Sequence, residues 1–592
     1  MFNAEQKIIE AKIRAYFADS SIPQPDEFTW NSIPFTGEWG ISTSFFRIAA
    51  QETRQRSSQG NQTVPVPQRA QQIAVEVADY IGTPAGFARV EPVKGYLNLY
   101  YAPDVYSSRV LDAVIELGDQ YGCGEPKGEL IMVEFSQPNT HKAFHVGHLR
   151  SAILGEVLCR ILECAGYSVV RANYYGDIGL HVIKWLWNYM KYHAGEKPPQ
   201  DTTRWMGDLY AEAIQRLEEN PELETEIRQV YARWDRDDPE VVDLWRKTRQ
   251  WSIDGFNDIY KLLDIRFDRE YSNSEAEKPG KEFVEELIEQ GIAEDERPQG
   301  PVIVRIDELL GLKKEKFRVL VILRSDGTAL YSTEDLALAK AKFSEYPLDR
   351  SLYVVDVRQS LHFQQVFKTL EIADYPWAEQ CQHISYELVN LPGNVVMASR
   401  DGTMVLLEDL IREASTRARD LVEGKNPQLS HEEKEQVAQA VGIGALKYPM
   451  LARENTKYVT FDWESALDFN GQAAPYIQYA HVRANSILRR METPLPGPLT
   501  PAHELEPAEV QLIDMLSRLH SEVQRAAQEH KPLILTNLAY ETARAFNDFY
   551  NQCPVLQAQP EIRDFRLRIV AATRQVLAKE LNLLSITAPQ VM

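Results

Sequence analysis

The feature that most constrains the fold is a strand, a loop, a helix and a second strand that follow one another within residues 129–173. Residues 129–135 form a short apolar run, which predicts a strand. The next apolar residues recur at helical spacing, namely Leu149, Ile153, Val157 and Ile161. Gly166 ends this helix, and residues 168–173 predict the second strand. Such a βαβ unit implies a parallel sheet with a right-handed crossover.

Two further regions interrupt and then extend this pattern. A charged, helical stretch over residues 184–265 predicts an insertion. Strands and helices resume at residues 319–323, before an Asp-Gly turn signal, and continue at residues 352–356. We therefore expect a Rossmann-type parallel-sheet domain over residues 121–390 that carries a helical insertion.

The segments outside this region have different sequence patterns. Residues 1–120 begin with an amphipathic helix and end in a strand-like alternation, which predicts a small α+β domain. Residues 391–455 hold a Gly-rich loop followed by helices, and residues 456–592 are helical throughout. The chain is therefore predicted to be a multidomain α/β protein with an all-α C-terminal bundle.

Composition argues against several classes of protein. The five cysteines are scattered and form no CxxC pair, so neither a disulfide framework nor a structural zinc site is expected. The chain has neither an apolar run of about 18 residues for a membrane span nor an N-terminal signal-peptide block. These features predict a cytoplasmic protein. The net charge of −22 argues against non-specific binding of polyanions but allows a local basic groove.

The loop between the first predicted strand and its helix has the sequence of a nucleotide site. Residues 136–148 leave the carboxyl end of a parallel strand and enter a helix whose free N–H groups and dipole attract phosphate. Gly147 lets the backbone approach a nucleotide closely. His145 and His148 are one helical turn apart, so both imidazoles can face one phosphate and stabilise its developing charge.

Two other interpretations of the histidine pair are possible. An HxxH pair can be an ordinary surface or core pair, or it can hold a metal ion. The strand–loop–helix context, the Pro-Asn before the pair and the glycine within it favour the nucleotide site. No third histidine, cysteine or carboxylate follows at ligand spacing, so we expect no protein-held metal.

The motif His145-Val146-Gly147-His148 resembles the HIGH signature of class I aminoacyl-tRNA synthetases. Because HxGH also occurs in other nucleotidyltransferases, the flanking segments decide the member. Residues 134–139, 149–151, 173–179 and 474–483 are similar to segments of the arginyl-tRNA synthetase family. Residues 572–584 resemble its anticodon-binding helix bundle, and residues 37–50 resemble its N-terminal tRNA-contacting domain.

This resemblance implies a two-step reaction. L-Arginine and ATP, with Mg²⁺ bound to the phosphates, would form arginyl-adenylate, and the 3′-terminal ribose of tRNA(Arg) would then accept the arginyl group. Rival interpretations are a class I enzyme for another amino acid such as cysteine, a non-catalytic tRNA-binding paralogue, and a small nucleotidyltransferase of the pantothenate-synthesis type. The family resemblance also implies a monomer.

The resemblance implies an arginine site built from the first strand and from the helix after residue 330. Glu134 and Asp335 would bind the guanidinium, and Tyr331 would pack along the arginine side chain. Asn139 and Gln359 would bind the α-amino end. An alternative is that Asp335 and its neighbour Glu334 are a solvated pair at a helix start, and for Glu334 this alternative is favoured. Glu134, in an apolar strand, needs a partner or a ligand.

The second ATP loop of class I enzymes, KMSKS, departs from its pattern in this chain. At the matching place Met397-Ala398-Ser399-Arg400 lacks the lysine that normally braces the pyrophosphate. The resemblance implies that Lys142, just before the HIGH-like motif, compensates for this loss, and Arg400 would add a second cation. Met397 joins His145 and His148 as a predicted ATP contact. Lys142 could otherwise be a plain surface lysine.

The C-terminal helices offer candidate tRNA contacts. Arg563, Arg566 and Arg574 are predicted to bind tRNA, because cations suit phosphates. Aromatic residues lie among them and could stack on unpaired bases, namely Phe546, Phe549, Tyr550 and Phe565. The alternative, favoured for the aromatic residues, is a helical core with a charged face.

Overall fold

The computed structural model describes residues 3–33, 37–59, 62–144, 146–391, 395–396 and 406–592, and it forms two compact units. The first unit contains Met1–Tyr121, Ala480–His520 and Leu538–Lys579. The second unit contains Gly122–Tyr479, Ser521–Asn537 and Glu580–Met592. Both units are therefore assembled from segments that lie far apart in the sequence. No helix of the described residues combines the length and the apolar character needed to cross a membrane.

The second unit is built around a five-stranded parallel sheet with the order β12-β11-β5-β6-β7. The strands are β12 (Cys381–Tyr386), β11 (Arg350–Asp356), β5 (Leu130–Glu134), β6 (Ser168–Tyr175) and β7 (Arg269–Ser272). The central strand β5 is buried from its second residue onward, as expected for a strand covered on both faces. The predicted parallel α/β sheet is confirmed.

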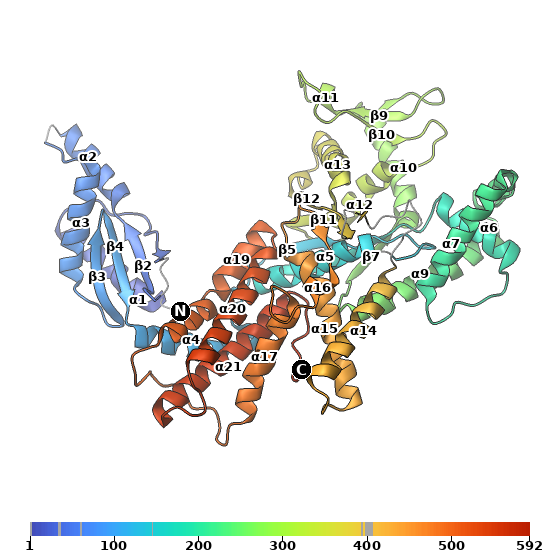
Figure 1. Cartoon of the computed structure of the whole chain (residues 1–592). Coiled ribbons are helices and arrows are strands. Elements are labelled where there is room, and N and C mark those ends of the chain that lie inside the picture. Colours follow the sequence, from blue (N-terminus) through green and yellow to red (C-terminus); the bar gives the residue numbers. More distant parts are fainter. Residues whose placement is uncertain (1–2, 34–36, 60–61, 145, 392–394, 397–405) are drawn as a thin grey trace. The chain divides into compact units, whose positions relative to one another are not determined.

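Helices cover this sheet. Helix α5 (Val146–Cys164) joins β5 to β6, and α12 (Tyr331–Glu345) and α13 (Ser360–Ile372) flank β11 along the chain. Leu338 of α12 packs against Met132 and Ala172 on one face of the sheet. Figure 1 shows the strands between α12 and α13 on one side and α5 and α15 (His431–Leu451) on the other. This arrangement leaves the carboxyl ends of β5, β6 and β11 free to build a site.

One strand predicted from the α/β pattern belongs to a different sheet. Strand β10 (Val319–Leu323) pairs antiparallel with β9 (Val302–Arg305), which pairs with β8 (Glu294–Asp295). Val319 and Val321 are exposed, whereas Leu320 and Ile322 are buried. This alternation is typical of an antiparallel sheet with one solvated face. The apolar run predicted the strand, but it could not show which sheet the strand joins.

The helical insertion lies between β6 and β7. It consists of α6 (Leu180–Tyr192), α7 (Thr202–Glu219), α8 (Glu224–Trp234) and α9 (Pro239–Leu262). Buried residues such as Trp185, Met206 and Val241 form its own hydrophobic core. After β7, α10 (Asn273–Glu289) leads to the separate sheet of β8, β9 and β10. Because β6 and β7 are parallel, the insertion begins at the carboxyl edge of the sheet, where the candidate site lies, and ends at the amino end of β7.

The first unit combines an N-terminal sheet with C-terminal helices. Its sheet has the order β1-β2-β4-β3, from β1 (Asn31–Ser32), β2 (Gly40–Ser44), β4 (Tyr96–Tyr101) and β3 (Phe87–Val93). The helices of its N-terminal segment are α1 (Asn3–Asp19), α2 (Phe46–Ser58), α3 (Val66–Ile81) and α4 (Pro103–Leu117). The later helices include α18 (Pro507–Ser517), α20 (Leu533–Gln552) and α21 (Pro560–Leu583). Trp39 Nε1 donates to Asp514 Oδ1 at 3.1 Å and ties these segments together.

Candidate active site

A pocket with a volume of about 340 Å³ opens at the carboxyl ends of β5, β6 and β11. It brings together residues that the sequence separates widely. The predicted site residues that line it are Glu134, Asn139, Gly147, His148, Tyr331, Asp335 and Gln359. Because these side chains come from different elements, only the parallel sheet places them in one pocket.

The loop between β5 and α5, residues 135–144, is fixed against the end of β6. Asn139 forms a parallel bridge with Gly176, and Thr140 N donates to Gly176 O at 2.9 Å. A Cβ atom at Gly176 would lie 2.1 Å from Asn139 Oδ1, so glycine is required for this approach. The ends of the two strands therefore form one continuous wall of the pocket.

The HIGH-like motif lies at the start of α5. Gly147 and His148 are half-buried in its first turn, and the His148 ring stacks on Phe144 with a centroid distance of 5.2 Å. His145 lies outside the described residues, as do Met397 and Arg400 of the second ATP loop. Helix α14 (Leu407–Lys425) begins directly after that loop.

Lys142 lies on the insertion side of the β5–α5 loop. Its Nζ is 5.2 Å from the centroid of the Tyr210 ring, which belongs to α7. Burial and the nearby Lys184 lower the pKa of Lys142. Lys142 is half-buried, so the plain-surface alternative fits this lysine poorly.

Glu134 already has a cation inside the protein. Its Oε2 lies 2.6 Å from Nζ of Lys342, a lysine with no exposed side-chain surface, and its Oε1 accepts from Gln137 Nε2 at 3.0 Å. Lys342 Nζ also lies 3.9 Å from the Tyr353 ring centroid. The sequence prediction did not include Lys342. Lys342 lies between Ala341 and Phe343 in α12, and this local sequence does not distinguish it from the partly exposed Lys340.

Asp335 and its neighbour Glu334 lie in different environments. Asp335 Oδ2 lies 2.5 Å from His362 Nε2, and both residues line the pocket. Glu334 is buried and accepts hydrogen bonds from Tyr174 and Asn273. Burial and the adjacent Asp335 raise the pKa of Glu334 to about 8. The prediction that Glu334 is a solvated helix-start residue is wrong, because the start of α12 packs against β6 and α10.

Tyr331 and Gln359 form the outer part of the pocket. Tyr331 opens α12 and is 67% exposed, which leaves its ring available to a ligand. Gln359 is exposed in the short helical turn Val357–Gln359 before α13. The pocket thus has carboxylates at its base and a phenol and an amide near its mouth.

Comparisons with known proteins agree with this geometry. The family model for class I (R) tRNA synthetases, catalytic domain, matches residues 111–463, and the model for the DALR anticodon binding domain matches residues 477–592. Arginine–tRNA ligase from Clostridium perfringens is 36% identical over 528 residues, covering 88% of this chain and 90% of that protein. The chain belongs to the arginyl-tRNA synthetase family.

Other relatives support the family. Arginine–tRNA ligase from Treponema pallidum is 35% identical, covering 83% of this chain and 84% of that protein. The structure of Thermus thermophilus arginyl-tRNA synthetase matches with a TM-score of 0.78 and 27% identity, over 99% of this chain and 100% of that one. A Plasmodium falciparum arginyl-tRNA synthetase shares the fold, with a TM-score of 0.71 and 19% identity.

Family membership confirms the predicted function. This arginyl-tRNA synthetase family member is a class I ligase that joins L-arginine to tRNA in two steps, ATP-dependent adenylate formation and transfer of the arginyl group. The cysteine enzyme and the pantothenate-type nucleotidyltransferase are set aside, because this chain matches the class I (R) catalytic model and the DALR model and resembles arginine–tRNA ligases over most of its length.

The predicted tRNA contacts of this synthetase differ in accessibility. Arg566 is buried, with its Nε 2.7 Å from Glu509 Oε1 and its Nη1 donating to Pro554 O. Its guanidinium is therefore used inside the first unit, and its predicted tRNA role is not favoured. Arg563, paired with Asp564 at 3.1 Å, and Arg574 are half-buried on α21. The three phenylalanines are fully buried, as in the core alternative, whereas Tyr550 is exposed.

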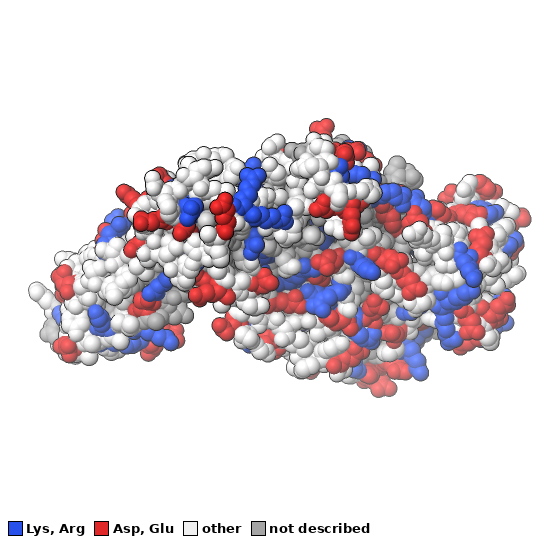
Figure 2. Space-filling view, turned by 90° about the horizontal axis from the view of Figure 1, so that it is seen from below, with Lys and Arg blue, Asp and Glu red and all other residues white. Residues whose placement is uncertain are grey.

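Figure 2 shows acidic and basic side chains intermixed over the face in view. A net charge of −22 therefore coexists with local groups of lysine and arginine on this face. Such mixing allows a polyanion to bind at particular places and to be repelled at others.

Proposed function

We propose that Asp335 is the carboxylate that binds the guanidinium of arginine. The observation that carries this assignment is the different charge environment of the two predicted carboxylates. Glu134 is neutralised by buried Lys342, whereas Asp335 lies beside His362 at the pocket wall. A charge-assisted, bidentate pair with a guanidinium is strong and geometrically specific. Glu134 then contributes by shaping the base of the pocket with Gln137.

The remaining pocket residues suit the other parts of the amino acid. Tyr331, exposed at the start of α12, would pack along the methylene chain of arginine. Asn139 and Gln359 present neutral amide oxygens that accept hydrogen bonds from an ammonium group. This arrangement directs the substrate carboxylate toward the start of α5.

ATP is assigned to the start of α5. His145, Gly147 and His148 would bind the nucleotide together with the free N–H groups of the helix, and Met397 would contact it from the second ATP loop. Lys142 and Arg400 would stabilise the pyrophosphate. Mg²⁺ would arrive on the phosphates of ATP, which it binds readily while keeping several waters.

The chemistry then needs positioning more than proton transfer. An oxygen of the arginine carboxylate attacks the α-phosphorus, the bond to the bridging oxygen breaks, and pyrophosphate leaves with the electron pair. The terminal ribose hydroxyl of tRNA next attacks the adenylate carbonyl, and AMP leaves. Orientation and charge stabilisation by the residues above would lower both barriers.

The partners and the setting complete the proposal. We assign tRNA(Arg) contacts to the N-terminal α+β region and to the DALR region, with Arg563 and Arg574 as candidate phosphate contacts. The DALR match and the half-buried position of both arginines support this assignment. We further propose that the enzyme acts as a cytoplasmic monomer.

Two measurements test the proposal. Charging of bulk tRNA with each of twenty labelled amino acids should succeed with arginine alone.

The second measurement uses Lys142→Ala, which should lower kcat for adenylate formation by about 100-fold or more, because one phosphate contact in a transition state contributes about 3 kcal/mol. The affinity of this variant for arginine should change by less than about threefold. Lys313→Ala, an exposed lysine outside the pocket, is the control. Equal rates for Lys142→Ala and wild type would overturn the role of Lys142.

A further inference from the structure

The β5–α5 loop has a strained backbone. Ser136, Gln137 and His141 have φ angles of 78°, 49° and 59°, in the left-handed region that residues other than glycine rarely adopt. Three such residues within six positions persist only where surrounding contacts fix them. The loop also carries Asn139 and Lys142, which lie between or beside these residues.

Helix α9 of the insertion supplies the contacts that fix this loop. Ser252 Oγ accepts a hydrogen bond from His141 N at 3.0 Å, and Thr248 Oγ1 lies 2.8 Å from His141 Nε2. Tyr260 Oη lies 2.7 Å from Ser136 Oγ. Residues 248, 252 and 260 are multiples of four apart, so they share one face of α9. This face contacts the loop from Thr248 to Tyr260.

The hydrogen-bond partners of His141 indicate which of its ring nitrogens carries the proton. Thr248 Oγ1 donates to Leu244 O at 2.9 Å, so it must accept from His141 Nε2. Nδ1 lies 2.9 Å from Thr140 Oγ1, whose hydroxyl proton can be donated to Nδ1 or to Gly176 O at 3.3 Å. His141 has no exposed surface, and burial lowers its pKa, in keeping with a neutral imidazole.

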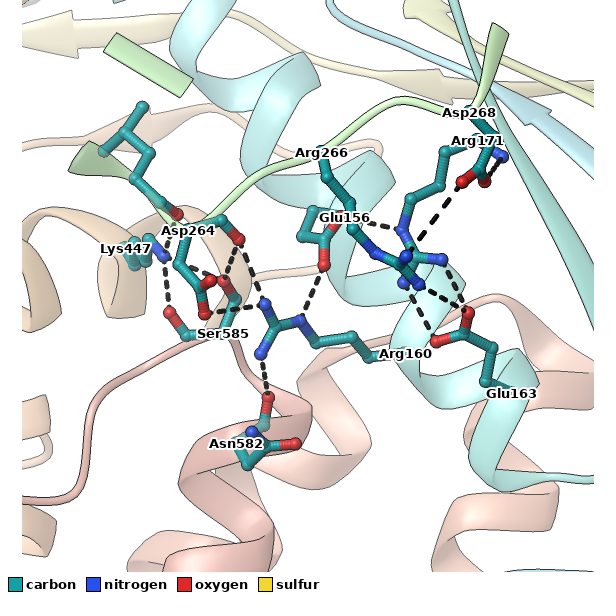
Figure 3. Close-up of polar contacts among 11 residues, drawn as sticks. Glu156, Arg160, Glu163, Arg171, Asp264, Arg266, Asp268, Lys447, Asn582 and Ser585 are labelled. Atoms are coloured by element: carbon teal, nitrogen blue, oxygen red, sulfur yellow. Dashed lines mark hydrogen bonds and ion pairs between the residues drawn. The ribbon is translucent and has the colours of Figure 1, made fainter. Parts of the chain in front are cut away.

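Helix α9 is itself held in place by contacts near its middle and just after its end. Near its middle, Arg249 Nε donates to Asp177 Oδ2 at 2.7 Å, and Trp245 Nε1 donates to Asp177 O. At its end, Arg160 of α5 donates to Asp264 Oδ2 at 2.7 Å, and Lys447 of α15 donates to the carbonyl of Leu263. Figure 3 shows these two cations converging on the segment that follows α9. The helix is thus held by the end of β6 and by helices α5 and α15.

We propose that Thr248 and Ser252 of α9 are positioning residues for adenylate formation. Through the neutral side chain and the backbone N–H of His141, they hold the β5–α5 loop in its left-handed conformation. That conformation places Asn139 in the pocket and Lys142 beside the start of α5. The inference rests on the proposed roles of Asn139 and Lys142. It gives the helical insertion a part in the first chemical step.

Thr248→Val and Ser252→Ala test this proposal in the full-length enzyme. Thr248→Val keeps the shape of the side chain but leaves His141 Nε2–H without an acceptor. We expect each variant to lower kcat for adenylate formation, measured by ATP–pyrophosphate exchange with tRNA present, by 10- to 100-fold. The KM for arginine should change less than threefold, and the melting temperature should fall by only a few degrees. Thr248→Ser should restore most of the rate, because it restores the hydroxyl.

A control and a comparison separate the possible results. Gln250→Ala alters a side chain on the outer face of the same helix, where Gln250 bonds only to Asp254 in the described structure, and it should keep the full rate. An unchanged kcat in Thr248→Val and Ser252→Ala would overturn the proposal. Full activity of Lys142→Ala with slow Thr248→Val would instead overturn the assigned role of Lys142 and leave the loop contact standing.

Discussion

At the scale of single residues, two neighbouring carboxyl groups of α12 have opposite properties. Glu334 is buried beside Tyr174 and Asn273 with a pKa raised to about 8, so it carries its proton at neutral pH. Asp335 lines the pocket beside His362. A buried carboxyl with neutral donors and an adjacent carboxylate keeps its proton, because ionisation would place two like charges together. Of these two residues, Asp335 is the one that lines the pocket.

The pair supports a matched test of arginine binding. Asp335→Asn removes the charge that the guanidinium needs, and we expect the KM for arginine to rise about 100-fold, equivalent to about 3 kcal/mol. Glu334→Gln resembles the protonated acid and should change that KM by less than about threefold at pH 7. Steady-state aminoacylation measures both. A larger effect from Glu334→Gln than from Asp335→Asn would reverse the assignment.

Glu334 also predicts a pH dependence of stability. Its pKa is raised from 4.5 to about 8, so between these values the folded chain keeps a proton that the unfolded chain has lost. The unfolded state binds fewer protons, and stability falls as pH rises through this window. In Glu334→Gln the side chain does not titrate, so this variant does not lose stability in this way as the pH rises. Its melting temperature relative to wild type should therefore rise by several degrees between pH 5.5 and pH 8. Parallel melting curves at all pH values would contradict the expectation.

Several residues of the site follow from the sequence, and others do not. The strand–loop–helix pattern predicted that Gly147 and His148 lie at the carboxyl end of a parallel strand, where ligands bind, and the family resemblance added Asn139. The pairing of Glu134 with Lys342 depends on how α12 packs on the sheet, and no local pattern encodes it. The burial of Glu334 has the same origin.

At the scale of elements, Lys447 connects three parts of the second unit. Its Nζ donates to Leu263 O after α9 and to Ser585 O and Oγ in the C-terminal segment, and its side chain is buried in α15. Figure 3 shows this convergence beside Arg160. An ammonium has three donors, which match these three acceptors.

Replacing this lysine should loosen the C-terminal segment. Lys447→Met keeps the length of the side chain but leaves buried carbonyl groups without donors, which costs about 2–4 kcal/mol. We expect a fall of several degrees in the melting temperature and faster digestion of residues 580–592 by carboxypeptidase. Gln436→Ala, at an exposed position of the same helix, should leave both unchanged. Equal digestion of Lys447→Met and wild type would show that other contacts hold the segment.

The bounds of individual strands were predicted better than the strands with which they pair. The bounds of β10 match the predicted strand at residues 319–323, yet its partner is β9 in an antiparallel sheet. An apolar run gives the strand but not its neighbour, which depends on contacts distant in sequence. The parallel strand at residues 352–356 was placed correctly because a helix follows it.

At the scale of the whole molecule, the first unit joins the N-terminal segment to two segments from the C-terminal part of the chain, residues 480–520 and 538–579. The sequence predicts residues 1–120 and 456–592 as separate domains, whereas the structure groups most of both into one compact body. Tyr121 Oη donates to Leu516 O at 3.0 Å, and Gln575 Nε2 donates to Asp119 Oδ1 at 2.8 Å. Composition and periodicity describe each segment by itself, so they carry no information about this association.

A buried ion pair makes this association testable. Arg568 of α21 has a side chain that is 4% exposed, pairs with Asp112 of α4 and donates to Pro496 O at 2.7 Å. Asp112→Ala leaves a buried guanidinium without its carboxylate, and breaking such a pair costs about 3 kcal/mol. We expect the melting transition of the first unit to fall by several degrees. Asp564→Ala, which breaks a half-exposed pair, should cost less than about 1 kcal/mol.

The double variant Asp112→Ala/Arg568→Met completes the cycle. Removing both charges should recover part of the stability that Asp112→Ala loses, because no unpaired charge then remains buried. Limited proteolysis of the C-terminal helices follows the same order, with Asp112→Ala cut fastest. If Asp112→Ala and Asp564→Ala melted and were cut alike, the N-terminal segment would not stabilise the C-terminal helices through α4. The two segments would then be held by the Trp39–Asp514 contact and its neighbours instead.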